Sequence, residues 1–248
     1  MRKIALTFIL VLSAIAMRGQ ICTGEDPVSY GLELPAVKSS EKAQKTMPRL
    51  DMEKVRREDR EDAANGLPLR FGYAYDVNFD LDNSGEWTEL EDGGRLWRLE
   101  ISCPGALSIN LLYDKFRLPE GAKFFVYTSD RKRSMGAFTS KNNRGDSKDV
   151  RGYATGLLPG DKITLEYYLP GNTNETGFIS VSKVVHGYQG FASIIGEDMP
   201  PGTHAGCSIQ VNINCPAGGN WQNEKKAVAL VVVGGIRHCT GSLINNTN

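Results

Sequence analysis

Three histidines, His186, His204 and His238, are the side chains of this chain best suited to acid–base catalysis. A serine nucleophile needs such a base within hydrogen-bonding distance, and the base needs a third group to orient it. His186 ends an apolar segment, and the sequence contains neither a G-x-S-x-G nor a G-D-S-G stretch that would supply the nucleophile. We therefore assign no catalytic residue to this chain.

The cysteines could form disulfides or bind a metal. The chain has five, and three of them lie close to its C-terminus: Cys207, Cys215 and Cys239. Alternating apolar residues predict a strand between Cys207 and Cys215, which would hold them roughly 25 Å apart. That is too far for a mutual disulfide, so each needs a partner elsewhere. Zinc held by these thiols and His238 is the alternative, but no C-x2-C spacing supports it. We expect structural disulfides, and no metal or other cofactor.

The segment Asp80–Gly85, with Glu91 at the twelfth position, has the ligand spacing of a calcium-binding EF-hand loop. An EF-hand also needs flanking helices, whereas residues 73–79 and 95–101 alternate like strands. Asn83-Ser84-Gly85 is equally typical of a hairpin turn. We favour the turn, with a calcium loop as the alternative.

The N-terminus predicts export. Arg2 and Lys3 precede an apolar run, residues 4–12, and small residues follow it. This order is typical of a secretory signal peptide, which we assign to residues 1–20. Export permits disulfides, and Cys103 could pair with Cys22.

Composition excludes some partners. Of 248 residues, 40% are hydrophobic, and 29 Lys and Arg balance 29 Asp and Glu. A net charge of zero gives no support to a nucleic-acid partner. Mean hydropathy is −0.32, and no later apolar run could span a bilayer, so we expect no stable membrane insertion.

Residues 21–69 predict a polar leader with one helix, and residues 21–48 within it read as extended or disordered. The helix covers residues 50–64, where Asp51 is suited to cap its start and Asn65-Gly66 to end it. Few of its side chains could be buried, so we expect it to be mostly solvated.

Residues 70–190 predict an all-β domain, an antiparallel β-sandwich. Short segments of alternating apolar residues are separated by Pro-Gly and Pro-Glu-Gly turns. The expected strands are residues 73–79, 95–101, 106–113, 122–128, 162–169 and 178–185.

The remaining chain predicts a linker and a second β unit. Residues 191–206 are rich in Gly and Pro and read as an exposed connection where proteolysis would concentrate. In residues 207–248, the run Ala227–Val233 predicts a strand buried on both faces. Gly234-Gly235 breaks it, and a second strand begins at Ile236.

Two regions of the chain resemble a known family. "CTGSLINN" after an apolar strand looks like the second β-hairpin of a trypsin-like serine protease of the bacterial lysyl-endopeptidase type. "LPEGAKFFVY", a "LLPGD" turn and "ITLEYYLP" resemble the prodomain of such secreted precursors.

The resemblance implies the N-terminal part of an exported serine endopeptidase zymogen. Its prodomain, a folding aid or an inhibitor, would pack on its own protease domain, of which residues 207–248 are the first strands of a double β-barrel. The Ser-His-Asp triad would lie beyond Asn248 and act on protein or peptide substrates, and Cys207, Cys215 and Cys239 would bridge to later cysteines. The alternative is a secreted, non-enzymatic β-sandwich that binds carbohydrate or a cell surface.

Overall fold

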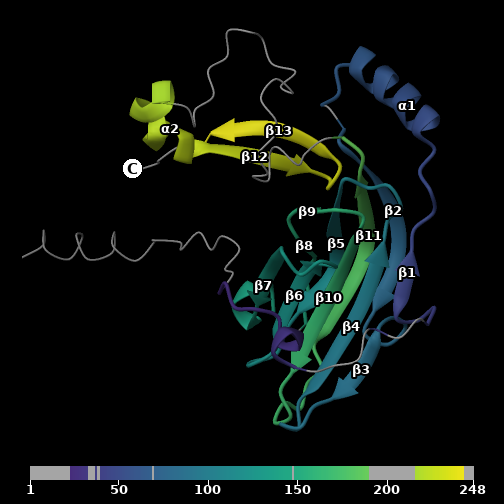
Figure 1. Cartoon of the computed structure of the whole chain (residues 1–248), viewed down its shortest axis with the longest axis vertical. Helices are drawn as coiled ribbons and strands as arrows, with labels where there is room; N and C mark the ends of the chain where they lie inside the picture. Colours follow the sequence, from purple (N-terminus) through teal and green to yellow (C-terminus); the bar gives the residue numbers. More distant parts are fainter. Residues whose placement is uncertain are drawn as a thin grey trace, which may run out of the picture.

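The computed structural model describes residues 23–32, 37, 40–68, 70–146, 148–189 and 216–242. Two β-sheets pack face to face, with helix α1 beside one end and a separate two-stranded hairpin across that same end (Figure 1). The all-β fold and the antiparallel sandwich predicted from the strand pattern are confirmed. The double barrel stays a prediction.

Sheet I has six strands. Five follow the order β1-β4-β10-β6-β7, and β3 pairs with the first half of β4. Its strands are β1 (Gln44–Thr46), β3 (Glu86–Glu89), β4 (Arg95–Ser102), β6 (Lys123–Thr128), β7 (Ser134–Phe138) and β10 (Lys162–Leu169). Sheet II has the order β2-β11-β5-β8, with β9 also paired to β5. Its strands are β2 (Gly72–Asp80), β5 (Ser108–Arg117), β8 (Tyr153–Ala154), β9 (Leu158–Pro159) and β11 (Phe178–Gly187).

The core lies between the two sheets because alternate residues of each strand point inward. On β4 these are Trp97, Leu99 and Ile101, all with no exposed surface. In the antiparallel register of β10 they lie opposite Tyr167, Leu165 and Ile163. The predicted strand at residues 95–101 therefore has the correct inward face.

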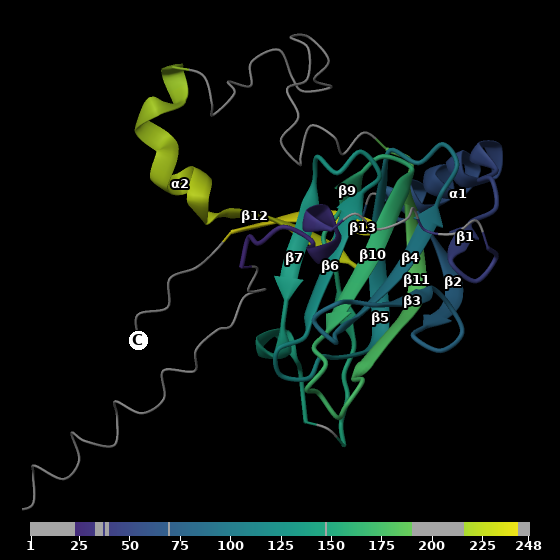
Figure 2. The ribbon, with the colours of Figure 1, turned by 60° about the horizontal axis from the view of Figure 1, so that its bottom comes forward.

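Part of the leader is ordered and packs on the sandwich, contrary to the expectation of an extended or disordered segment. A 3-10 turn, η1 (Val28–Gly31), lies beside β6 and β7 (the purple segment in Figures 1 and 2). Strand β1 pairs in parallel with β4, an exception in the largely antiparallel sheet I. Local hydrophobic patterning could not show this, because the partners lie far away in sequence.

The predicted helix is confirmed as α1 (Met52–Ala64). The carboxylate of Asp51 accepts hydrogen bonds from the backbone N–H groups of Glu53 and Lys54, both at 3.1 Å, and Asn65 caps the end. Only Val55 is fully buried along the helix.

The segment 80–85 forms a tight turn, as expected, but it joins strands of different sheets and is not a hairpin. Oδ1 of Asp80 accepts from the backbone N–H groups of Asp82 and Asn83, at 2.9 and 2.8 Å. The Ser84 carbonyl accepts from Nε1 of Trp97 at 2.7 Å, which ties the turn to the core. Within the described part of the chain, no three His, Cys, Asp or Glu side chains are grouped for a metal ion.

Beyond the linker, the described chain resumes with η3 (Pro216–Trp221) and α2 (Gln222–Ala227), followed by β12 (Val228–Val233) and β13 (Arg237–Ser242). β12 and β13 pair in antiparallel register, which confirms the predicted hairpin. Val228 and Val233 are 57% and 51% exposed, so the expected burial of this strand on both faces is wrong for the described residues. In the described structure, β13 alone pairs with β12. None of the described helices is long and apolar enough to cross a membrane.

Candidate functional site

The tip of the β12–β13 hairpin contacts the outer face of sheet II, near one end of its strands. Gly234 and Gly235 have φ angles of +59° and +77°, the left-handed pair of a type I′ turn, which the Ile236 N–H closes by donating to the Val233 carbonyl at 3.3 Å. The N–H of Phe71 donates to the Ile236 carbonyl at 2.8 Å, and Nδ2 of Asn110 donates to the Gly235 carbonyl at 3.3 Å. The tip is thus held through its main chain.

Apolar contacts reinforce these hydrogen bonds. Ile236 packs against a small cluster on the outer side of sheet II, formed by the fully buried Phe71 and Val185 with Ala74 and Leu157. Gly235 lies so close to Leu112 that a Cβ atom built on it would be 3.0 Å from the leucine side chain. This tight approach and the left-handed φ of Gly235 both favour glycine at the tip.

Arg237 joins the hairpin to helix α1. Its guanidinium donates through Nη1 to the carbonyl of Pro68 at 2.6 Å and through Nη2 to the carboxylate of Asp62. The two side chains are only 20% and 26% exposed, respectively. A partly dehydrated, hydrogen-bonded ion pair is stronger than one in open solvent.

A second arginine fixes α1 itself. Arg70, 10% exposed, donates through Nε to Asp59 at 2.8 Å and through Nη2 to Glu58 at 3.1 Å. The hydroxyl of Tyr188, at the end of the sandwich, donates to Asp59 at 2.9 Å, and burial raises the pKa of this tyrosine. α1 is therefore anchored to the sandwich by contacts that do not involve the hairpin.

A comparison with protein families identifies the part of the chain that contains α1 and the two sheets. The family model of the lysyl endopeptidase N-terminal domain matches residues 43–188. The chain belongs to this family. The matched residues run from β1 to the end of β11, so they include α1 and both sheets, and the hairpin follows them. No solved structure matches the chain.

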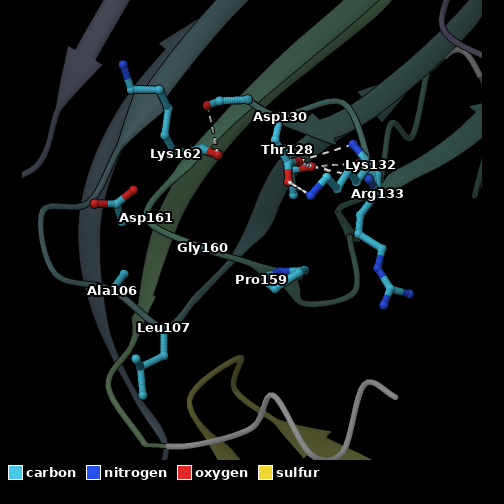
Figure 3. A pocket seen from close by; sticks show the side chains of 11 residues that line it. Ala106, Leu107, Thr128, Asp130, Lys132, Arg133, Pro159, Gly160, Asp161 and Lys162 are labelled. Atoms are coloured by element: carbon cyan, nitrogen blue, oxygen red, sulfur yellow. Dashed lines mark hydrogen bonds and ion pairs between the residues drawn. The ribbon is translucent and has the colours of Figure 1, made fainter. Parts of the chain in front are cut away.

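A surface pocket of about 630 Å³ lies at the end of the N-terminal domain that the hairpin contacts (Figure 3). Three turns line it, at residues 106–107, 128–133 and 159–162. Leu107 is 47% exposed there, and its N–H donates to the carbonyl of Gly187, beside the hairpin contact.

Charges of both signs surround this pocket, and several are held by local hydrogen bonds. The carboxylate of Asp130 accepts from the Thr128 hydroxyl at 2.5 Å and from the Lys132 N–H at 3.1 Å. The Thr128 hydrogen bond, above all, lowers the pKa of Asp130. An open hollow with a polar, mixed-charge rim suits contact with another protein surface better than it suits enclosing a small molecule.

The sequence-predicted residues fall in three places. Cys207, Cys215 and His204 lie outside the described residues. Cys239 lies on β13, opposite Val231 on β12, and its disulfide stays a prediction. His238 is its neighbour, opposite Val232.

His186 and Cys103 belong to the interior of the N-terminal domain. His186 lies on β11, 2% exposed, with its ring edge-on to Tyr75, and burial lowers its pKa. Within the described part of the chain Cys103 forms no disulfide, and its side chain is fully buried. The pairing suggested with Cys22 involves a residue outside the described part.

Arg70, Asp62 and Arg237 were missed by sequence reasoning. α1 carries bases as well as acids and looked self-neutralising, so its charges predicted a solvated helix. The only local signal was that Arg70 and Arg237 each lie next to an apolar residue that begins or precedes a strand. That signal is too common to single them out.

Proposed function

We propose that this chain is the N-terminal segment of an exported serine endopeptidase zymogen. In this proposal residues 1–20 direct secretion, the sandwich is the prodomain, and residues 207–248 begin the protease domain. The family match at residues 43–188 supports a protease precursor. In this proposal the triad, and the site that binds the peptide substrate, lie in the part of the precursor after Asn248.

The contact between sandwich and hairpin carries the proposal. An isolated two-stranded hairpin is marginally stable in water at best. This one exposes between 38% and 57% of Val228, Val231, Val232 and Val233. The sandwich supplies it with three hydrogen-bond donors and an apolar contact, and α1 supplies a carboxylate. We infer that the prodomain is a folding template that holds the β12–β13 hairpin of the protease domain in register.

The linker sequence bears on activation. Residues 197–206 contain no Lys or Arg. A protease that cuts after basic residues would not cut there, so we propose that a separate enzyme releases the prodomain.

Deletion of the matched domain tests the function. The complete gene product would be expressed with and without residues 43–188, keeping the signal peptide. Hydrolysis of a lysyl peptide substrate in the medium would be measured, together with the amount of protease antigen. We expect activity from the intact precursor only. Equal activity per molecule without residues 43–188 would contradict the template role, and no peptidase activity from the intact precursor would contradict the protease assignment.

A further inference from the structure

Three different kinds of contact converge on the four residues of the hairpin tip. The Ile236 carbonyl accepts from the N–H of Phe71, Ile236 packs on Val185 and Phe71, and the Arg237 guanidinium binds Asp62. Main-chain, apolar and charged contacts together specify both the position and the sequence of the bound segment. The contacts therefore depend on the side chains of the hairpin as well as on its backbone.

The acids of α1 are divided between two arginines from different parts of the chain. Glu58 and Asp59 bind Arg70 of the sandwich, and Asp62, one turn further along, binds Arg237. Because residues three and four apart share one face of a helix, the three acids form one row. The first two fix the helix, and this leaves the third to face the hairpin.

The geometry requires arginine at position 237. Its planar fork donates at once to a main-chain carbonyl, that of Pro68, and to the Asp62 carboxylate. A lysine ammonium is a point charge and cannot reproduce two donors in fixed directions.

We propose that α1 and the adjoining end of sheet II form a docking site for the Gly234–Arg237 tip, and that this site keeps the two parts together after the linker is cut. The inference rests on the proposed function in assigning the hairpin to the protease domain. Processing of the linker would then leave a non-covalent complex, and release of the prodomain would require the Asp62–Arg237 contact to break. Because the pair is partly exposed, added salt should weaken the complex.

A cut chain tests the docking site directly. A recognition sequence for an unrelated, sequence-specific protease would be placed between residues 197 and 206 of the full chain. After cutting, in reductant to exclude any disulfide, co-elution of the two pieces would be measured by gel filtration and their affinity by dilution. We expect co-elution at low salt and at least about tenfold weaker binding for Asp62→Asn, since one partner of a partly buried pair is lost.

Glu61→Gln is the matched control, because it removes the same charge from the neighbouring, exposed position of α1. We expect it to bind like the unmodified chain. Asp62→Arg combined with Arg237→Asp should regain part of the lost affinity, while circular dichroism checks that each variant folds. Separation of the unmodified pieces, or equal weakening by Glu61→Gln and Asp62→Asn, would overturn the docking site. Neither outcome depends on protease activity, so a failed deletion experiment and a failed docking experiment are distinguishable.

Discussion

The backbone N–H of Ser29 donates a hydrogen bond to Oε1 of Glu166 at 3.1 Å, across 137 residues of sequence. Glu166 lies on the outer face of sheet I and yet has no exposed surface, because η1 covers it. The Tyr127 hydroxyl donates to its other oxygen at 3.1 Å. In the register of β10 with β4, Glu166 lies opposite Arg98, which is 7% exposed. The ordered leader thus seals a buried, charged position of the sheet.

Replacing Tyr127 by Phe should destabilise the sandwich. The variant keeps the ring that packs edge-on to Tyr30, at 5.2 Å, but removes a donor to a buried carboxylate. We expect the free energy of unfolding to fall by about 1–3 kcal/mol, measured by urea denaturation. Tyr168→Phe is the control, because that hydroxyl binds Asp92 at the surface and its loss should cost about 0.5 kcal/mol or less. Equal losses in the two variants would show that the buried hydrogen bond to Glu166 stabilises the fold no more than the exposed one does.

Gly85 is the glycine of the turn that a calcium loop would also require, and here its role is steric. Its φ is +73°, and an added Cβ atom would lie 2.3 Å from the indole of Trp97. Gly105 has a similar φ of +85° but open space around it. Gly105→Ala should therefore cost about 1–2 kcal/mol for its left-handed backbone alone. Gly85→Ala should cost about 1–3 kcal/mol more, from overpacking.

Thermal and urea denaturation of both variants would measure this difference. Addition of calcium to the unmodified protein provides a separate check on the turn. We expect no change in its midpoint of unfolding, since both oxygens of Asp80 accept hydrogen bonds within the turn. A calcium-dependent rise would favour the metal-loop alternative instead.

The sandwich could be predicted because its information is local. Residues 95–101 and 162–169 alternate so regularly that both their strands and their inward faces follow from the pleat. The packed leader could not be predicted, since Ser29 and Gln44 gain their order from β10 and β4, strands far away in the chain. The docking of the hairpin is a similar case. Asp62 and Arg237 are 175 residues apart, and nothing near either residue identifies its partner.

His186 should make the domain less stable in mild acid. Burial lowers the pKa of His186 below its usual value, so below about pH 6.5 the unfolded chain binds a proton that the folded chain resists. Its contribution to stability is thus complete above that pH and is lost as the pH falls towards the folded-state pKa. Urea midpoints between pH 7.5 and 5.5 should decline for the unmodified protein and less steeply for His186→Gln. Parallel pH profiles would show that this ring does not set the dependence.

The Cys103 thiol should react with alkylating reagents only slowly until the domain unfolds. It has no exposed surface, and burial, with a smaller effect of Asp161, raises its pKa to about 12 from a reference of 9.0. At pH 8 this difference lowers the reactive thiolate by about a thousandfold, in addition to blocking access. Alkylation by iodoacetamide, followed by peptide mapping, should label Cys103 slowly in buffer and rapidly in denaturant, both without reductant. Rapid labelling in buffer would contradict the buried thiol. Labelling in denaturant only after reduction would show instead that Cys103 is bridged, with Cys22 as the first partner to examine.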